Sequence, residues 1–250
     1  MLSLRLFTVL AGFGASLGLW RILRAAPDEV KLNHLISGLT ALLGAFIGAR
    51  TVYVLAHPVF FSLHPGEAAQ FWSGGWNAFG ALAGAVLFTL LAAAVMRIRA
   101  LHSLDTISLL LLPLATLIWL GLWYEGVAYG IPLPSNAFFS LPAPDETGML
   151  VNRFPLQLAA AVTLLFLLWF IEYRTRSDRP GFRFSVLGLG FSTHLLVFSM
   201  FRSDQVFPIR GIRSDAFFSL LSALIFALLT LILLLPALRK RDKMKPEESA

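Results

Sequence analysis

Seven long apolar stretches, bounded by short polar segments, follow one another along the chain. A helix of about 20 such residues crosses a hydrocarbon core of about 30 Å. We therefore predict seven transmembrane helices, at Leu2–Trp20, Asn33–Ala56, Trp76–Met96, Leu104–Trp123, Leu156–Tyr173, Phe182–Phe201 and Asp215–Leu238. The fourth ends least clearly, since GLWYEGVAYG at 121–130 can continue as broken or re-entrant backbone, which a membrane tolerates only where protein or water surrounds it.

Composition favours an integral membrane protein over a soluble one. Hydrophobic residues make up 57% of the 250 residues and charged residues 14%, and a soluble domain would expose too much apolar surface. We predict an all-α fold with a single seven-span domain at 1–238 and a basic cytoplasmic tail at 239–250. The N-terminal stretch lacks a clear cleavage site, so we interpret it as a retained span. The absence of cysteine excludes disulfides and thiol chemistry.

Positive charges concentrate in alternate loops. Of the 20 Lys and Arg residues, 14 follow spans one, three and five or lie in the C-terminal tail, and such an excess marks the cytoplasmic side. The N-terminus is then outside and the C-terminus cytoplasmic. The net charge of +6 reflects this topology, and we expect no nucleic-acid partner. The outer loops, Pro58–Gly75, Ile131–Arg153 and Arg202–Ser214, are rich in Pro, Gly and Phe, which makes that side the expected working face.

Arg50 is an ionisable residue inside the second span, about 10 Å from its outer end at about 1.5 Å per residue. Such groups are costly in a bilayer and commonly mark function. Arg50 either snorkels toward the outer interface or, as we favour, binds a phosphate or carboxylate in a cavity. Gly44 and Gly48 form a GxxxG face just before it, where another helix can approach closely. Tyr53 lies on the same helix face as Arg50.

Two further polar residues lie in the later spans. Glu125 either pairs with Arg50 or Arg153 or acts as a general base, and without an evident partner group the base is the weaker hypothesis. His194 lies midway along the sixth span, where no His or carboxylate stands three or four residues after it. A packing role is therefore favoured over that of a ligand. The sequence implies no metal site and no cofactor.

Several arginines near the outer ends of spans five to seven break the positive-inside pattern. Arginine suits phosphate because its planar guanidinium donates two parallel hydrogen bonds. These side chains either form a mouth that attracts an anion or pair with Asp204, Asp215 and lipid headgroups. They are Arg153, Arg202, Arg210 and Arg213.

Five segments resemble, in order, motifs of the bacterial prolipoprotein diacylglyceryl transferase family, which moves a diacylglyceryl group from phosphatidylglycerol to a lipobox cysteine. The resemblance covers roughly Leu42 to Asp204. It implies a seven-span fold with its N-terminus outside, a site opening to the outer leaflet and a place in the bacterial cytoplasmic membrane. It also implies phosphatidylglycerol and prolipoprotein signal peptides as partners. The segments are GARTVYVL (48–55), WSGGWNAFGALAG (72–84), WLGLWYEGVAYG (119–130), RFPLQL (153–158) and GFSTHLLVFSMFRSD (190–204).

The chain keeps mainly the framework of these motifs. The retained residues are Arg50, Tyr53, Trp72, Gly74, Gly75, Gly80, Gly84, Gly121, Gly126, Gly130, Pro155, Gln157 and Arg202. Many polar positions of the family are replaced here, at Phe79, Trp119, Leu122, Glu125, Val127, Phe154, Ala159, Ala160, Phe191 and Leu195. Transfer needs a base to form a thiolate and cations to stabilise the leaving phosphate. Large apolar residues supply neither, so we predict a partly filled cavity.

Three functions are compatible with these observations. The favoured one is a relative with altered or lost transfer that binds phosphatidylglycerol or a similar anionic phospholipid in an outward-facing cavity, or that partners with another membrane protein. The second is an active divergent transferase, with Glu125 as base and Arg50, Arg153 and Arg202 binding phosphate. The third is a small-solute or lipid transporter, which the lack of an internal repeat disfavours. The expected lipid-binding residues are Arg50, Tyr53, Asn77, Arg153, Gln157 and Arg202.

Overall fold

Seven long helices form the body of the protein in the computed structural model, which describes residues 2–144, 148–175, 179–206 and 208–242. Each is long and apolar enough to cross a membrane, which confirms the predicted seven-span, all-α architecture. In chain order they are α1 (Leu2–Ala25), α2 (Lys31–Ala56), α4 (Ala78–Val95), α5 (Ala100–Glu125), α6 (Leu156–Arg174), α7 (Phe182–Ser199) and α8 (Ser214–Asp242).

Short elements join these helices. They are the 3-10 turns η1 (Asp28–Val30), η2 (Pro65–Ala69) and η3 (Phe71–Ser73), the helix α3 (Pro58–Leu63), and the strands β1 (Leu141–Pro144), β2 (Leu150–Arg153), β3 (Pro208–Ile209) and β4 (Ile212–Arg213). The strands pair as two antiparallel hairpins, β1–β2 and β3–β4. The sequence pattern did not predict them, because proline within a short run argues against a strand except at a sheet edge.

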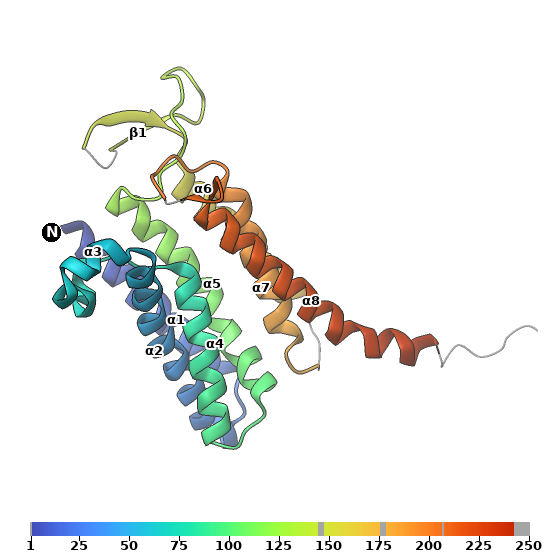
Figure 1. Ribbon diagram of the computed structural model, residues 1–250. Helices are drawn as coiled ribbons and strands as arrows, with labels where there is room; N and C mark the ends of the chain where they lie inside the picture. Colours follow the sequence, from blue (N-terminus) through green and yellow to red (C-terminus); the bar gives the residue numbers. More distant parts are fainter. Residues whose placement is uncertain (1, 145–147, 176–178, 207, 243–250) are drawn as a thin grey trace, which may run out of the picture.

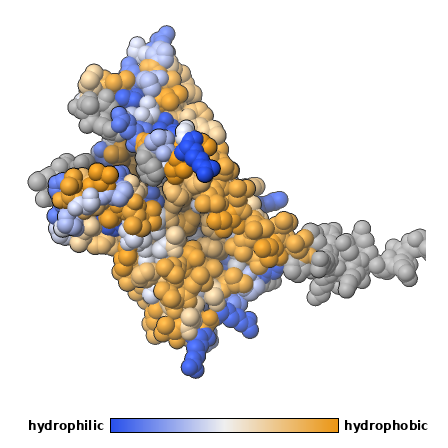
Figure 2. Space-filling model, in the orientation of Figure 1, coloured by the Kyte–Doolittle hydropathy of each residue, from blue (hydrophilic) through white to orange (hydrophobic). Residues whose placement is uncertain are grey.

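The bundle has one loop-rich end and one loop-poor end (Figure 1). Residues 57–77, 126–144, 148–155, 200–206 and 208–213 make up the loop-rich end, which is the end predicted to face outside. Figure 2 shows apolar side chains over most of the visible side of the bundle, with hydrophilic residues gathered toward its ends. This distribution suits a body surrounded by lipid with polar groups at two interfaces.

Helices α2 and α4 pack against each other through two pairs of glycines. Gly44 lies against the carbonyl oxygen of Gly84, and Gly48 lies against that of Gly80, so that a methyl group on any of the four would overlap backbone atoms. The close approach predicted for the GxxxG face of α2 is therefore confirmed. Its partner is the matching GxxxG face of α4, where small residues let two backbones meet without intervening side chains.

Helix α1 packs against α5 around a proline. Pro113 has no N–H, so the carbonyl of Leu109 loses its intrahelical partner. The Nη1 of Arg21 on α1 donates to that oxygen at 2.8 Å, which satisfies a backbone group that would be costly to leave unpaired inside a membrane. Gly14 and Gly18 of α1 lie directly against the same stretch of α5, so the two helices also approach each other closely at the proline site.

The start of α7 is capped by a side chain from another helix. Asp105, on α5, accepts hydrogen bonds from the backbone N of Gly181 at 2.6 Å and of Phe184 at 2.9 Å. These N–H groups belong to the first turn of α7, which has no intrahelical acceptors for them. A carboxylate at a helix N-terminus also interacts favourably with the helix dipole, so Asp105 joins α5 to α7 at the loop-poor end.

Several helix ends differ from the predicted spans. Helix α1 continues beyond Trp20 to Ala25, and α8 continues to Asp242, within the segment assigned to the basic tail. The rest of that tail, residues 243–250, lies outside the described residues. Helix α5 ends at Glu125, where Gly126 adopts a left-handed conformation with φ 67°. The fourth span thus gives way to irregular backbone, as the sequence suggested.

Candidate functional site

Residues 126–133 form the hub of the loop-rich end, because they are hydrogen-bonded to two other loops. Ile131 donates to the carbonyl of Phe201 and accepts from the backbone N of Phe154, both at 3.0 Å, and Ser203 donates to the carbonyl of Tyr129 at 2.9 Å. The end of α5, the start of α6 and the α7–α8 loop are therefore held together by backbone contacts. Any side chain carried by these three segments is brought to one place.

Three predicted site residues meet at this hub. Gln157, in the first turn of α6, donates from Nε2 to the carbonyl of Val127 at 2.8 Å. The guanidinium carbon of Arg153 lies 4.4 Å from the centre of the Tyr129 ring, in a buried cation–π contact. Glu125 terminates α5 just before this hub. The structure thus gathers Glu125, Arg153 and Gln157 around the 126–133 segment.

A cavity of about 280 Å³ opens beside these residues. Gln157 and Tyr129 line it together with the end of α5 and the hairpin strand β1, the other lining residues being Trp123, Tyr124, Gly126, Pro142 and Ala143. Pockets that bind small molecules commonly measure about 300–1,000 Å³. The cavity can therefore accept a headgroup-sized fragment, whereas acyl chains would have to lie outside it.

Glu125 does not form the expected ion pair. Within the described part of the chain it pairs with neither Arg50 nor Arg153, and its Oε1 is buried without a hydrogen-bond partner. The prediction that Glu125 pairs with one of these arginines is thus wrong. The reason is geometric, since both guanidinium groups are engaged elsewhere, on loop carbonyls and on the Tyr129 ring. A buried carboxylate oxygen with no donor is costly.

Arg50 lies in a different group, within the loop that joins α2 to α4. The side chain is only 4% exposed, and it donates to backbone carbonyls of that loop. The acceptors are the oxygens of Ala68 (from Nε, 3.0 Å), Glu67 (from Nη2, 2.6 Å) and Gly74 (from Nη1). The guanidinium reaches toward the predicted outer end, as the snorkelling interpretation required, but its partners are protein carbonyls.

The glycines of the WSGG segment make this arrangement possible. Gly74 and Gly75 have φ angles of 80° and 76°, which side chains other than glycine rarely adopt. A Cβ on Gly75 would also overlap the ring of Tyr53 and crowd the guanidinium of Arg50. Tyr53 in turn lies under Arg50, with its ring centre 5.7 Å from the guanidinium carbon.

Asn77 serves as the N-cap of α4. Its Oδ1 accepts from the backbone N of Gly80 at 2.9 Å, and its own backbone N donates to the carbonyl of Ala49 at 3.1 Å. An asparagine cap of this kind satisfies one of the free N–H groups of the first turn. Asn77 therefore belongs structurally with Arg50 and Tyr53 and not with the hub.

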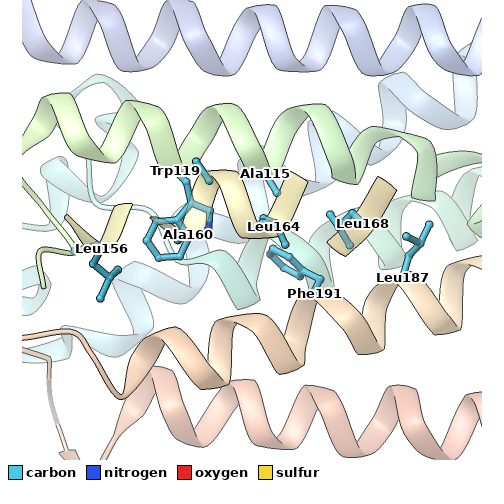
Figure 3. Close-up of a cluster of buried hydrophobic side chains, with 10 residues drawn as sticks. Ala115, Trp119, Leu156, Ala160, Leu164, Leu168, Leu187 and Phe191 are labelled. Carbon is cyan, nitrogen blue, oxygen red and sulfur yellow. The ribbon is translucent and has the colours of Figure 1, made fainter. Parts of the chain in front are cut away.

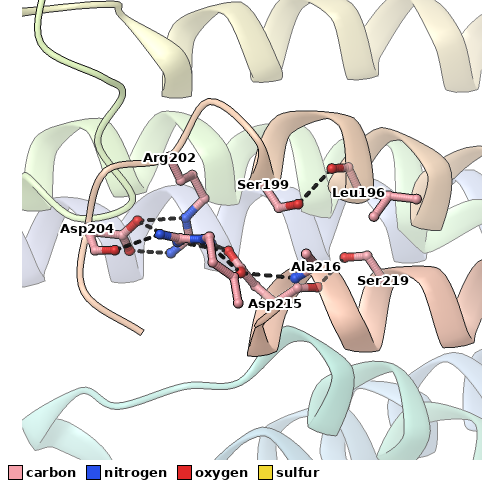
Figure 4. A network of polar contacts seen from close by, with 8 residues as sticks. Leu196, Ser199, Arg202, Asp204, Asp215, Ala216 and Ser219 are labelled. Atoms are coloured by element: carbon pink, nitrogen blue, oxygen red, sulfur yellow. Dashed lines mark hydrogen bonds and ion pairs between the residues drawn. The ribbon is translucent and has the colours of Figure 1, made fainter. Parts of the chain in front are cut away.

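Arg202 forms ion pairs with Asp204 and Asp215 (Figure 4). Arg213 pairs with the same two carboxylates. Arg202 donates from Nε to Asp204 at 2.9 Å, and Arg213 donates to both carboxylates at 3.1–3.2 Å. Burial acts to lower the pKa of Arg202, but the hydrogen bond and charge of Asp204 and the charge of Asp215 outweigh it and raise the pKa. The sequence left open whether the outer arginines attract an anion or pair with the aspartates. For Arg202 and Arg213, pairing with the aspartates is confirmed.

Six of the ten replaced family positions gather in one apolar cluster. Trp119, Ala160 and Phe191 belong to a group of buried side chains between α5, α6 and α7 (Figure 3). Leu122, Phe154 and Leu195 pack against the same group. Trp119 is only 5% exposed, so these positions are filled with tightly packed hydrophobic atoms. The prediction that the family's polar cavity is partly filled is consistent with this packing.

His194 lies at the margin of this apolar cluster. Its Nε2 is 3.0 Å from the Oγ1 of Thr163, and its ring stacks on Phe198 with centres 4.3 Å apart. The favoured packing role of His194 thus agrees with its surroundings. Phe79, where the resemblance places a histidine, lies against Phe218 of α8, with ring centres 5.6 Å apart.

Tyr129 is the main participant that the sequence interpretation did not place. Tyr129 lines the cavity and lies under Arg153, yet its sequence neighbourhood carries no charge other than Glu125. The sequence signal that could have indicated Tyr129 is its place between Gly126 and Gly130, in irregular backbone at the end of a span.

The chain matches the family model described as prolipoprotein diacylglyceryl transferase over residues 1–233. Among similar curated proteins named phosphatidylglycerol–prolipoprotein diacylglyceryl transferase is one from Symbiobacterium thermophilum, 29% identical over 260 residues that cover 96% of this chain and 90% of that protein. Another, from Thermosynechococcus vestitus, is 25% identical over 86% of this chain and 79% of its own length. The one from Bacillus velezensis is 36% identical over 87 residues, which span 34% of this chain and only 32% of that protein.

Proposed function

The chain belongs to the prolipoprotein diacylglyceryl transferase family, and from this premise we propose that it binds phosphatidylglycerol or a similar anionic phospholipid at the hub, with diacylglyceryl transfer altered or lost. Family membership and the seven membrane-capable helices make it a multi-pass protein of the bacterial cytoplasmic membrane. The proposed site opens at the loop-rich end, on the outer leaflet.

The apolar cluster around Trp119 is the observation that carries this proposal. Transfer of a diacylglyceryl group to a thiol forms a sulfur–carbon bond while the bond from that carbon to the departing glycerol phosphate breaks. It needs a base for the thiol and cations for the leaving phosphate. At six positions where the resemblance implies polar side chains, the cluster places Trp119, Leu122, Phe154, Ala160, Phe191 and Leu195. Packed apolar atoms cannot accept a proton or stabilise a leaving phosphate, so the reaction lacks its expected groups.

Arg153 and Gln157 are the residues best placed to hold a lipid headgroup. Gln157 lines the cavity, and Arg153 lies over Tyr129, which lines it as well. An arginine in a partly dry site binds phosphate through charge-assisted hydrogen bonds. In this proposal Arg50, Tyr53 and Asn77 shape the neighbouring loop, and Arg202 holds the α7–α8 loop against the hub, so their effect on the lipid is indirect.

Lipid binding and transfer are tested separately. In purified protein, native mass spectrometry should show bound phosphatidylglycerol that is reduced about tenfold in Arg153→Gln, as expected for loss of one charge-assisted hydrogen bond. Arg153→Lys should keep part of the binding, and Arg210→Gln, which removes an exposed arginine at the same end, should change nothing. Equal binding by wild type and Arg153→Gln would contradict the assignment of the site.

Transfer is measured in cells depleted of their own transferase, by mass spectrometry of a prolipoprotein. We expect no diacylglyceryl modification from the wild-type chain. The active-transferase alternative draws support from Glu125, whose Oε1 is buried without a hydrogen-bond partner next to the cavity-lining Gly126. Modification that appears with wild type and disappears with Glu125→Gln would establish that alternative and refute the loss of activity.

A further inference from the structure

A second groove lies at the loop-poor end, away from the hub. It measures about 350 Å³ and runs between the end of α1 and the middle of α5, lined by Trp20, Arg21, Arg24, Ala25 and Leu109. We call it the α1–α5 groove. None of its residues takes part in the proposed headgroup site, and the groove is separated from that site by the length of the bundle (Figure 1).

Arg21 forms the fixed wall of the α1–α5 groove. Its Nη1 donates to the carbonyl of Leu109, which Pro113 leaves without an intrahelical donor, and its Nη2 pairs with Glu172 on α6. Two contacts from two helices therefore hold the guanidinium in place. Glu172 neutralises its charge, and Arg21 lines the groove with an Nε–H that makes no hydrogen bond to any described residue.

Arg24 supplies the uncompensated charge. It lies one turn after Arg21 on α1, with its guanidinium carbon 5.2 Å from the centre of the Trp20 ring. The side chain is exposed and forms no ion pair or hydrogen bond with the described part of the chain. The α1–α5 groove therefore carries a net positive charge, an unoccupied donor from Arg21 and an aromatic ring of the kind that favours the headgroup level of a bilayer.

An apolar stripe leads from the groove along α1. Val9, Phe13, Leu17 and Trp20 follow one another at helical spacing, and each is at least 36% exposed. In a membrane protein such a stripe faces lipid chains. The groove and the stripe together present a cationic pocket at the interface and an apolar track beneath it, which is the chemical outline of a phospholipid with a negatively charged headgroup.

We propose that the α1–α5 groove binds an anionic glycerophospholipid in the leaflet at the loop-poor end, the cytoplasmic leaflet in the predicted topology. Arg24 and the Nε–H of Arg21 bind the phosphate, and an acyl chain lies along Leu17 and Phe13. The lipid would hold α1 against α5 and α6 at the place where Pro113 interrupts the α5 hydrogen-bond pattern. This site is independent of the proposed function of the hub.

Arg174 offers a matched control. It too is an exposed arginine in the last turn of a spanning helix, at the loop-poor end, over an aromatic ring, with its guanidinium carbon 6.0 Å from the centre of Phe170. It does not line the α1–α5 groove. If Arg24 acted only as an interfacial arginine or as a charge at a helix C-terminus, the two residues would behave alike.

The test uses the full chain in vesicles that contain a phosphatidylglycerol with a photoreactive acyl chain, and cross-linked peptides are mapped by mass spectrometry. We expect cross-links on residues 9–20 that fall about tenfold in Arg24→Gln, remain largely in Arg24→Lys and are unchanged in Arg174→Gln. A phosphatidylcholine probe with the same chain should label this segment far more weakly. Cross-links at the hub report the other site and should not depend on Arg24.

Three results would overturn the proposal. Equal labelling of residues 9–20 by the two lipid probes would show that the groove does not select negative charge. Unchanged labelling of residues 9–20 in Arg24→Gln would show that Arg24 is an ordinary interfacial residue. Size-exclusion chromatography checks that Arg24→Gln and Arg174→Gln are both folded. Complete competition by glycerol 3-phosphate would show that the groove prefers a soluble phosphate to the lipid.

Discussion

The guanidinium of Arg50 illustrates how a charged residue in a span can be fully occupied by its own protein. Its donors are directed at the carbonyl groups of Glu67, Ala68 and Gly74, all in the loop between α2 and α4. At the scale of one residue, Arg50 determines the shape of the loop between α2 and α4.

Replacing Arg50 should therefore affect stability more than lipid binding. We expect Arg50→Gln to lower the free energy of unfolding by about 2–4 kcal/mol, because several buried carbonyls lose charge-assisted donors. The measurement is unfolding in detergent, together with proteolysis of the 57–77 loop. Arg174→Gln serves as the control, and an unchanged unfolding midpoint in Arg50→Gln would refute the structural role.

A second residue-scale prediction concerns Phe79. Phe79→His restores the family's histidine, yet we expect no gain of diacylglyceryl transfer, since other polar positions of the family hold Trp119 and Leu122 in the apolar cluster. The ring also leaves its contact with Phe218, so a modest loss of stability should accompany it. Mass spectrometry of a prolipoprotein in transferase-depleted cells is the readout, and recovered modification would contradict this view.

At the scale of elements, pairs of helices associate through small residues and through groups that replace missing hydrogen bonds. The α2–α4 contact is made by glycine backbones, and the α1–α5 contact combines glycines with the Arg21–Leu109 bond at Pro113. In a bilayer, helices gain no hydrophobic energy by leaving lipid for each other, so close packing and polar contacts must hold them.

This reasoning predicts a sharp difference between two glycine-to-alanine changes. Gly84→Ala places a methyl group on the carbonyl of Gly44, whereas a Cβ on Gly12 meets nothing within 4 Å. We expect Gly84→Ala to cost about 1–3 kcal/mol or more, as overpacking does, and Gly12→Ala to be nearly neutral. Thermal unfolding and the yield of monodisperse protein report the effect. Similar stability of the two variants would mean that the α2–α4 contact has room for a methyl group at Gly84.

At the scale of the whole molecule, the protein has two polar ends that differ in construction. The loop-rich end gathers the hub, the α2–α4 loop and the Asp–Arg network, and the loop-poor end has short connections with the α1–α5 groove between helices. The positive-inside rule predicts that the loop-rich end faces outside. Both proposed lipid sites take their leaflet from this topology.

The topology can be measured directly because the chain has no cysteine. Single cysteines at Gly66, in the loop after α2, and at Glu29, in the loop after α1, report the two ends. A maleimide that does not cross membranes should label Gly66→Cys in intact cells, and should label Glu29→Cys only after the membrane is permeabilised. The reverse pattern would invert the predicted orientation and exchange the leaflets of both sites.

The sequence alone was sufficient for the class of fold and for the family. Spans were predictable because a helix must be apolar over a bilayer's thickness wherever it packs, and the GxxxG face of α2 signalled a close neighbour whatever that neighbour was. The role of framework residues such as Gly84 can also be predicted from the sequence, since it depends only on the lack of a side chain.

Only the tertiary structure decided which polar residues belong together. Arg50, Glu125 and Arg202 were one set in the sequence, but they lie in the α2–α4 loop, at the hub and in the ion-pair network respectively. Spacing along a chain does not tell which carbonyl or carboxylate a long arginine side chain will reach, because its partner comes from another segment. The apolar cluster around Trp119 likewise became visible only when three helices brought six of the replaced positions together, since packing depends on neighbours that are distant in the chain.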